Sequence, residues 1–314
     1  MRLSSLHFGY LTLAAGMMGG PGDHPGLSAV PRGGVRVTSS MSGRNAATGI
    51  PFGLTGMTGR KLVEPYTGAM QQANPETVLQ DLAAARARRV QMIVNFAGSS
   101  EKTTAEGHFS YDLWKARVDR FLPVRDQLNG YVADGTLLLS YLIDEPNVKK
   151  RWGQAIPMET LDQMAEYSKS LFPDLTTTIR AAPRELQHYR WQYLDVAWAQ
   201  YTARKGPVAG YASTEAATAR AEGLGLIMGL NISKGGDGSS GFGSSSEPSM
   251  SGAEIVRYGQ TLLQVPDVCA FISWDNRPNV IDRPDVAAAL KQLAVLAKSH
   301  PNTPCRRKGN PSSP

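Results

Sequence analysis

Thr136-Leu-Leu-Leu-Ser-Tyr-Leu-Ile-Asp-Glu-Pro-Asn147 is an apolar run that ends in two carboxylates, a proline and an amide. A run this rich in Leu and Ile predicts a strand covered on both faces, as in a parallel sheet. Pro146 has no N–H to donate, so the strand pairing is expected to stop there. Asp144 and Glu145 are therefore predicted at the carboxyl end of a buried strand, where α/β proteins bind ligands.

Similar strand patterns recur along the chain and alternate with helix patterns. Strands are predicted at 50–54, 91–97, 136–143, 175–181, 194–201, 224–232 and 268–274. Helices are predicted to start near residues 74, 112, 161, 212, 251 and 284. An eighth strand is expected within 35–39 or within 98–130. This alternation indicates a parallel sheet with right-handed crossovers.

The ends of the predicted strands decide between two parallel-sheet architectures. Polar or aromatic side chains stand at the carboxyl end of nearly every strand. An open doubly wound sheet would gather them at one switch point, whereas a closed barrel uses all its strand ends. The sequence therefore predicts an α/β protein with a single-domain (β/α)8 TIM barrel, in which one strand is irregular or missing.

The bulk composition argues against several classes of protein. The 314 residues are 41% hydrophobic, which suffices for a core, and the formal net charge is +6. The basic residues are scattered rather than interleaved with aromatics, so a nucleic-acid partner is not expected. Neither G-x-G-x-x-G after a strand nor G-x-x-x-x-G-K-[ST] occurs, so a nucleotide is not expected either. Distant cysteines and scattered histidines form no metal-ligand cluster, and we expect no cofactor.

The two ends of the chain differ from its centre. Residues 1–20 resemble a short secretory signal peptide, so a secreted or periplasmic location is expected. Residues 21–49 are rich in Gly, Pro and Ser and are interpreted as an arm. The barrel is placed at 50–300, and 301–314 is interpreted as a basic disordered tail. No other segment has the ~18 uninterrupted apolar residues of a spanning helix, so we expect no membrane partner after signal removal. A monomer is also expected.

Cys269 and Cys305 are predicted to lie on the same face of the barrel. Cys269 starts the last strand, and Cys305 follows the last helix, which returns to the level where that strand begins. In an oxidising compartment the two thiols would form a disulfide that closes a loop of about 36 residues. The alternative is a buried Cys269 and a free Cys305.

Glu145 is the leading candidate for a catalytic residue. A carboxyl at the barrel mouth, flanked by Tyr141 and apolar neighbours, would be partly desolvated, which raises its pKa and suits it to donate a proton. The adjacent Asp144 adds like charge and would push one pKa of the pair further up. The alternative is that Asp144 or Glu145 caps a loop or pairs with Arg180.

These motifs resemble those of clan A glycoside hydrolases. In that family the fourth barrel strand ends in Asn-Glu-Pro, with Glu as the acid/base, and a Trp often ends the eighth strand under the sugar. Here Asp144-Glu145-Pro146 and Trp274 stand at the corresponding places. The resemblance implies that Glu145 is the acid/base and Trp274 the stacking platform. The family's nucleophile, a Glu at the end of strand seven, is not matched, because Asn231 stands there.

A glycosidase also needs a second carboxylate, about 5 Å from the acid for retention or roughly 6.5–9.5 Å for inversion. Asp275 is preferred because it stands beside a strand end, and its alternative role is that of an ordinary loop residue. Asp237 and Glu247 lie in a Gly/Ser-rich loop, 235–249, that could act as a lid. Further substrate-binding residues are expected at the strand ends: Asn95, Tyr141, Arg180, Gln200, Tyr201, Asn231 and Lys234.

The sequence is compatible with three functions. The first is a glycoside hydrolase-like barrel that acts on a poly- or oligosaccharide by carboxylate acid/base catalysis. The second is a non-catalytic carbohydrate-binding barrel, which the unmatched strand-seven Glu favours. The third is a barrel hydrolase or lyase with another polar substrate. Arg180 and Lys234 would suit an acidic sugar.

Overall fold

The computed structural model describes residues 49–306, and within this range eight parallel strands form a closed barrel. The order around the barrel is β1-β10-β9-β8-β7-β6-β3-β2, which closes because β1 pairs with both β10 and β2. The barrel strands are β1 (Phe52–Thr55), β2 (Gly68–Gln72), β3 (Gln91–Asn95), β6 (Leu137–Asp144), β7 (Thr176–Arg180), β8 (Val196–Tyr201), β9 (Gly225–Leu230) and β10 (Val268–Ser273). The predicted (β/α)8 barrel is thus confirmed.

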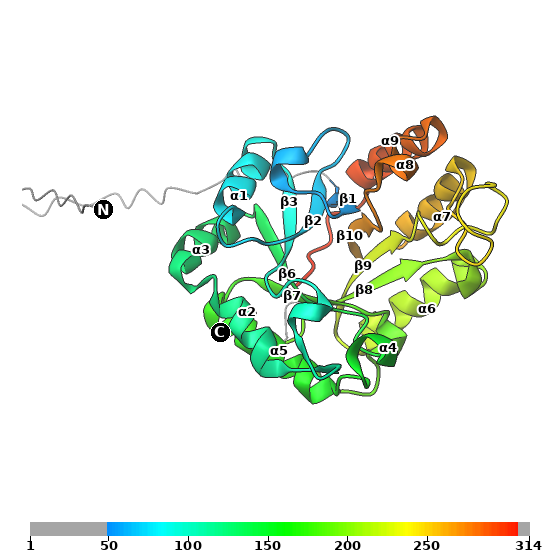
Figure 1. Cartoon of the computed structure of the whole chain (residues 1–314). Helices are drawn as coiled ribbons and strands as arrows, with labels where there is room; N and C mark the ends of the chain where they lie inside the picture. The colour runs from blue at the N-terminus through cyan, green and yellow to red at the C-terminus, as the bar shows by residue number, and fades with distance from the viewer. Residues whose placement is uncertain (1–48, 307–314) are drawn as a thin grey trace, which may run out of the picture. The chain divides into compact units, whose positions relative to one another are not determined.

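Helices lie on the outside of the barrel strands (Figure 1). The helices are α1 (Val78–Ala87), α2 (Tyr111–Asp119), α3 (Arg125–Ala133), α4 (Lys149–Trp152), α5 (Met158–Leu171), α6 (Val208–Ala221), α7 (Gly252–Leu263), α8 (Pro278–Ile281) and α9 (Pro284–Ser299). Within residues 49–306, none of them combines the length and the apolar character that crossing a membrane requires.

Alternate residues of each strand pack on opposite sides of the barrel wall. Ile93, Tyr141 and Trp198 belong to a buried cluster inside the barrel. Their chain neighbours, such as Val94 and Ala197, belong to the larger cluster between the strands and the helices. This period of two is the strand pattern expected when both faces are buried.

The predicted location of the eighth strand was wrong. The missing strand is β2 (Gly68–Gln72), which lies between the first two strands expected from the sequence. Residues 98–130 contain α2, part of α3 and a two-stranded antiparallel sheet, β4 (Thr104–Ala105) with β5 (His108–Phe109). The other candidate, 35–39, lies outside the described residues.

The composition of β2 explains why its pattern was missed. The strand reads Gly-Ala-Met-Gln-Gln, without any of the β-branched or aromatic residues that mark strands. Gly68 is required by close packing, since a Cβ there would lie 2.7 Å from Pro51 Cβ, and a Cβ on Gly53 of β1 would lie 1.7 Å from the carbonyl oxygen of Gly68. Two strand backbones meet here with no room for side chains.

Two other local predictions were tested by the structure. The capping box at the start of α7 is confirmed, because Ser251 Oγ accepts a hydrogen bond from Glu254 N–H and the Glu254 carboxylate accepts one from Ser251 N–H. Cys269 and Cys305 form the expected disulfide, with their Cα atoms 5.0 Å apart. The alternative of two separate thiols is therefore excluded.

Candidate functional site at the barrel mouth

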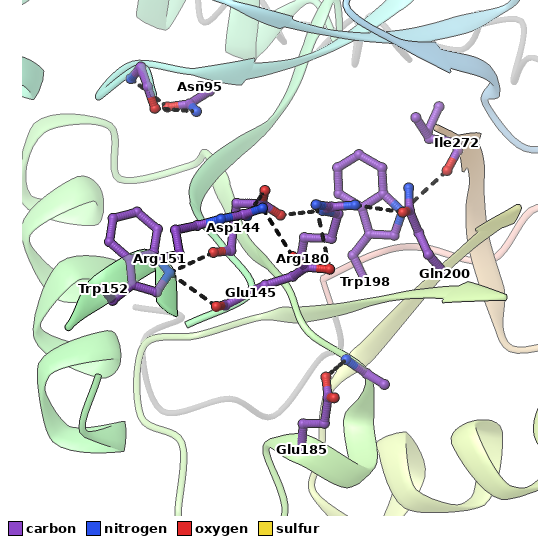
Figure 2. Close-up of polar contacts among 12 residues, drawn as sticks. Asn95, Asp144, Glu145, Arg151, Trp152, Arg180, Glu185, Trp198, Gln200 and Ile272 are labelled. Atoms are coloured by element: carbon purple, nitrogen blue, oxygen red, sulfur yellow. Dashed lines mark hydrogen bonds and ion pairs between the residues drawn. The ribbon is translucent and has the colours of Figure 1, made fainter. Parts of the chain in front are cut away.

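Asp144 lies at the end of β6, opposite Arg180 of β7. Arg180 Nε and Arg151 Nη1 both donate to its carboxylate (Figure 2). Burial alone would raise the pKa of this carboxyl, but the charges and hydrogen bonds of Arg180 and the charge of Arg151 outweigh burial and hold the pKa below its usual value. Asp144 is therefore ionised at neutral pH, and ion pairing with Arg180, one of the alternatives drawn from the sequence, is present.

A bulge in β6 brings Asp144 to the inner side of the barrel wall. Tyr141 pairs with Thr178 and Asp144 with Arg180, so β6 has one more residue than β7 between these two pairs. Strict alternation from Tyr141, which packs inside the barrel, would have pointed Ile143 inward instead. The extra residue thus aligns the Asp144 carboxylate with the Arg180 side chain.

Glu145 follows the strand at a sharp change of backbone direction. Its φ of 44° lies in the left-handed region, and Trp152 Nε1 donates to the carbonyls of both Asp144 and Glu145, each at 3.0 Å. The Glu145 carboxylate lies 3.2 Å from Arg151 Nη2 and 3.8 Å from Arg180 Nη2. Its side chain is 42% exposed. Its surroundings are therefore charged and partly solvated, unlike the apolar ones expected from the sequence.

Arg180 connects the carboxylates to the rest of the barrel mouth. Its Nη1 donates to Gln200 Oε1 at 2.6 Å, and its guanidinium lies 4.7 Å from the centre of the Trp274 ring. Burial alone would lower the pKa of Arg180, but the neighbouring Tyr141 and Asp144 raise it. The guanidinium is therefore a permanent charge shared by β6, β8 and the end of β10, as Figure 2 shows for Asp144 and Gln200.

A cavity of about 230 Å³, which we call the mouth cavity, opens between the ends of four strands. Polar and aromatic side chains of β2, β3 and β6 and of the segments after β6 and β10 line it: Gln72, Asn95, Tyr141, Asp144, Arg151 and Trp274. An aromatic ring beside several hydrogen-bonding groups is suited to a sugar ring, which has apolar faces and hydroxyl edges.

Glu145 lines a second, smaller cavity of about 90 Å³. Arg180, Gln200, Glu185 and Lys205 are among its other lining residues. Lys205 Nζ donates to the Gln200 carbonyl at 2.8 Å, and burial lowers its pKa. Asp144 and Glu145 therefore line different cavities although they are adjacent in sequence.

The remaining strand-end residues divide between the cavity and the core. Asn95 lines the mouth cavity while its amide holds a turn, accepting from Gly98 N–H at 2.9 Å and donating to the Gly98 carbonyl at 3.0 Å. Asn231 likewise accepts from Lys234 N–H at 3.1 Å. Tyr201 was expected to bind substrate, but it packs in the core and donates to the Gly206 carbonyl, because it is on the helix-facing side of β8.

Asp275 is tied to its own loop. Its carboxylate accepts from Arg277 N–H at 3.1 Å and from Ser233 Oγ at 3.3 Å, and it lies 2.9 Å from Arg277 Nε. It does not line the mouth cavity. These contacts match the alternative of a loop residue bonded to nearby backbone and side-chain groups.

The two acidic residues of the 235–249 loop are also paired. Asp237 binds Arg257 at 3.2 Å, and its hydrogen bonds to Ser239 lower its pKa to about 2. Glu247 lies 2.7 Å from Lys234 Nζ. Neither residue lines the mouth cavity in this arrangement.

Sequence reasoning missed three residues at the barrel mouth. Gln72 ends the strand that was not recognised, and Arg151 and Lys205 lie in connecting segments rather than at strand ends. Only Arg151 had a signal, in the run Lys149–Arg151 that follows the Asp-Glu-Pro motif. Among residues 49–306, no group of three His, Cys, Asp or Glu side chains could hold a metal ion.

Solved structures that resemble this barrel include the following two. A candidate glycoside hydrolase from Parabacteroides distasonis is 10% identical with a TM-score of 0.54, covering 84% of this chain and 98% of its own. An endo-β-1,4-mannanase double mutant from Cellulomonas fimi is 11% identical with a TM-score of 0.50, covering 85% of this chain and 74% of its own. No protein-family model and no curated protein sequence matches the chain. The chain thus shares the closed parallel barrel fold of these two structures.

Proposed function

We propose that the chain is an exported glycoside hydrolase-like barrel that acts on a poly- or oligosaccharide, with Glu145 as the general acid. The observation that supports this most directly is the unequal pairing of the two carboxylates that end the fourth barrel strand. Asp144 accepts hydrogen bonds from two arginines, whereas Glu145 has only looser contacts, at 3.2 and 3.8 Å, and is more exposed.

The two carboxylates would then have separate roles. Asp144 stays ionised and provides negative charge beside the sugar in the mouth cavity, where it would favour a developing oxocarbenium ion. Glu145, which lines the neighbouring cavity, would protonate the leaving oxygen, and this requires the glycan to extend from the mouth cavity into that cavity. Trp274 would stack against the sugar, and Asn95 and Gln72 would bind its hydroxyls. Asp275 is proposed as the second carboxylate, which requires its release from Arg277.

Glu145→Gln is the test of this proposal. The amide keeps the shape of the side chain but has no proton to give, so we expect glycan hydrolysis to fall by about 10²–10⁴-fold without a change in thermal unfolding. Release of reducing ends from a panel of polysaccharides measures the activity. Glu166→Gln, an exposed residue of α5, is the matched control and should be fully active. Unchanged turnover in Glu145→Gln would refute the assignment.

A non-catalytic carbohydrate-binding barrel is the second candidate. It is favoured by Asn231 at the end of β9, where no carboxylate is present, and by the arginine that holds Asp275. This candidate predicts saturable glycan binding by calorimetry that Trp274→Ala weakens, with no product formed by the unmodified protein. Detection of a cleaved bond would exclude it.

The proposed export rests on the disulfide, which oxidising compartments favour. We propose that residues 1–20 are a signal peptide and 21–49 an arm that precede the barrel in the sequence, and that 301–314 are a basic tail that follows it. N-terminal sequencing of the protein recovered from culture medium or periplasm would test this division, since it predicts a new N-terminus near residue 20.

A further inference from the structure

A third cavity, of about 220 Å³, lies between the loops that follow β9 and β10. We call it the loop cavity and define it by the residues used below: Lys234, Phe242, Glu247, Arg277 and Arg283. Three of these five side chains are cationic, and Glu247 is the only carboxylate among the lining residues. The loop cavity is therefore suited to an anion.

Arg283 of the loop cavity is held in place by Asp285 and by the Phe242 ring. Arg283 donates to Asp285, at 3.2 Å from Nε and 2.7 Å from Nη2, and its guanidinium lies 4.0 Å from the centre of the Phe242 ring. Its side chain is 10% exposed, and its Nη1 has no hydrogen-bond partner in the described structure. A buried charged donor without a partner is costly, and an anionic group would relieve that cost.

Glu247 occupies part of this positive environment. Its carboxylate lies 2.7 Å from Lys234 Nζ, and both side chains are nearly half exposed, at 47% and 43%. The hydrogen bond from Lys234, with added attraction from Arg204 and Arg277, lowers the pKa of Glu247. The loop cavity thus already binds one carboxylate, which belongs to the chain itself and can move into solvent.

Residues close together in the sequence line the loop cavity and the mouth cavity. Trp274 lines the mouth cavity, and Arg277, three residues later, lines the loop cavity. Trp274 also pairs with Asn231, three residues before Lys234. A glycan stacked on Trp274 that extends past the end of β10 would bring its next substituents to the loop cavity.

From this geometry we infer that the loop cavity is a subsite for an anionic substituent of the glycan, a carboxylate or a sulfate ester. The inference rests on the proposed function for the sugar in the mouth cavity, and it defines the substrate class as an acidic glycan. The anion takes the place of the Glu247 carboxylate at Lys234 and accepts from Arg277 and Arg283. Arginine and lysine donors bind such oxyanions through charge-assisted hydrogen bonds.

The test compares three monosaccharides that differ at one carbon atom: glucose, glucuronate and glucose 6-sulfate. Binding is followed by NMR titration of the unmodified protein, of Lys234→Gln and of Glu247→Gln. We expect Lys234→Gln to weaken binding of an anionic sugar about tenfold, because a charge-assisted hydrogen bond is lost. Glu247→Gln should strengthen the same binding because it removes the competing carboxylate. Glucose should respond to neither change.

Lys291→Gln is the matched control, since Lys291 is an exposed cation of α9 outside the loop cavity. Preference for glucuronate or for glucose 6-sulfate distinguishes the two anionic groups, and either one supports the inference. Two results would overturn the inference. One is equal affinity for glucose and both anionic sugars, and the other is that Lys234→Gln and Glu247→Gln do not change the affinity for an anionic sugar in opposite directions. The binding test does not depend on cleavage of a glycosidic bond. If anionic sugars bind as expected but no glycan is hydrolysed, the hydrolase proposal is rejected and the anionic subsite stands.

Discussion

Arg180 connects the charged and polar side chains of the barrel mouth. Its side chain is 8% exposed, and it contacts Asp144, Gln200 and Trp274. A buried guanidinium is tolerated only when its donors are satisfied, so these contacts fix its orientation. Arg180 also lines the smaller cavity together with Glu145, whereas Asp144, which it binds, lines the mouth cavity.

Asp144→Asn should lower stability at neutral pH and have less effect in acid. Arg180 and Arg151 hold the pKa of Asp144 below its unfolded value of about 3.9, so ionised Asp144 stabilises the fold above that pH. As the pH falls through the folded pKa, protonation removes this contribution from the unmodified protein. We expect a loss of about 2–3 kcal/mol near pH 7, less than for a fully buried pair.

Urea unfolding at a series of pH values measures this difference. Asp126→Asn is the control, because the Asp126 side chain is 85% exposed and its pair with Arg125 is a surface one. That substitution should change stability by less than about 1 kcal/mol at any pH. A destabilisation of Asp144→Asn that is the same at neutral and acid pH would contradict the ion-pair explanation.

At the scale of elements, a segment could be predicted when the residues that stabilise it are close together in the sequence. The start of α7 was predicted correctly because Ser251 and Glu254 satisfy each other's backbone groups three residues apart. β2 was missed because Gly68 and Gly53 are required by the close contact between β1 and β2. The neighbouring residues in the sequence do not reveal this contact. The bulge between Tyr141 and Asp144 was missed for the same reason, since it depends on the pairing with β7.

Ser251→Ala should destabilise the protein by about 1 kcal/mol, the usual cost of losing an N-cap. Ser251 Oγ accepts from Glu254 N–H at 3.2 Å, and this donor would be left unpaired. Glu254→Ala should cost more, because the buried carboxylate also accepts from Asp237 N–H at 2.7 Å and so ties the 235–249 loop to α7. Thermal unfolding ranks the two variants.

Ser213→Ala provides the comparison for these variants. Ser213 is exposed within α6, and its hydroxyl bonds only the Gly210 carbonyl of its own helix. Alanine is a better helix former, so we expect no destabilisation there. A Ser251→Ala variant as stable as Ser213→Ala would mean that the capping box is not a stabilising feature.

At the scale of the whole molecule, the order of elements along the chain was enough to predict the barrel. Residues at the carboxyl ends of parallel strands must meet at one mouth, which is why Asn95, Asp144 and Trp274 line a common cavity. The order of elements does not determine which way each side chain turns. Glu145 departs from the strand at a positive φ and lines a neighbouring cavity, a change that the sequence pattern does not encode.

The Cys269–Cys305 disulfide acts on the whole molecule because it joins the start of β10 to the segment after α9. Its cysteines are 36 residues apart, and in the chain-entropy model a loop of this length stabilises the folded state by about 4 kcal/mol. The loop contains β10, α8 and α9. Without the bond, the final strand and its helix remain attached to the barrel only by packing and by strand pairing with β9 and β1.

Cys269→Ser/Cys305→Ser should therefore lower the free energy of unfolding by about 3–4 kcal/mol in denaturant titrations. Part of any loss comes from placing hydroxyl groups at two buried positions, so Cys269→Ala/Cys305→Ala is measured as well. The unmodified protein unfolded with and without reductant isolates the bond itself. If the cross-link acts by restricting the unfolded chain, reduction should also raise the denaturant m value, because the freed chain exposes more surface. Equal stability of the oxidised and reduced protein would show instead that packing alone holds β10 and α9 in the barrel.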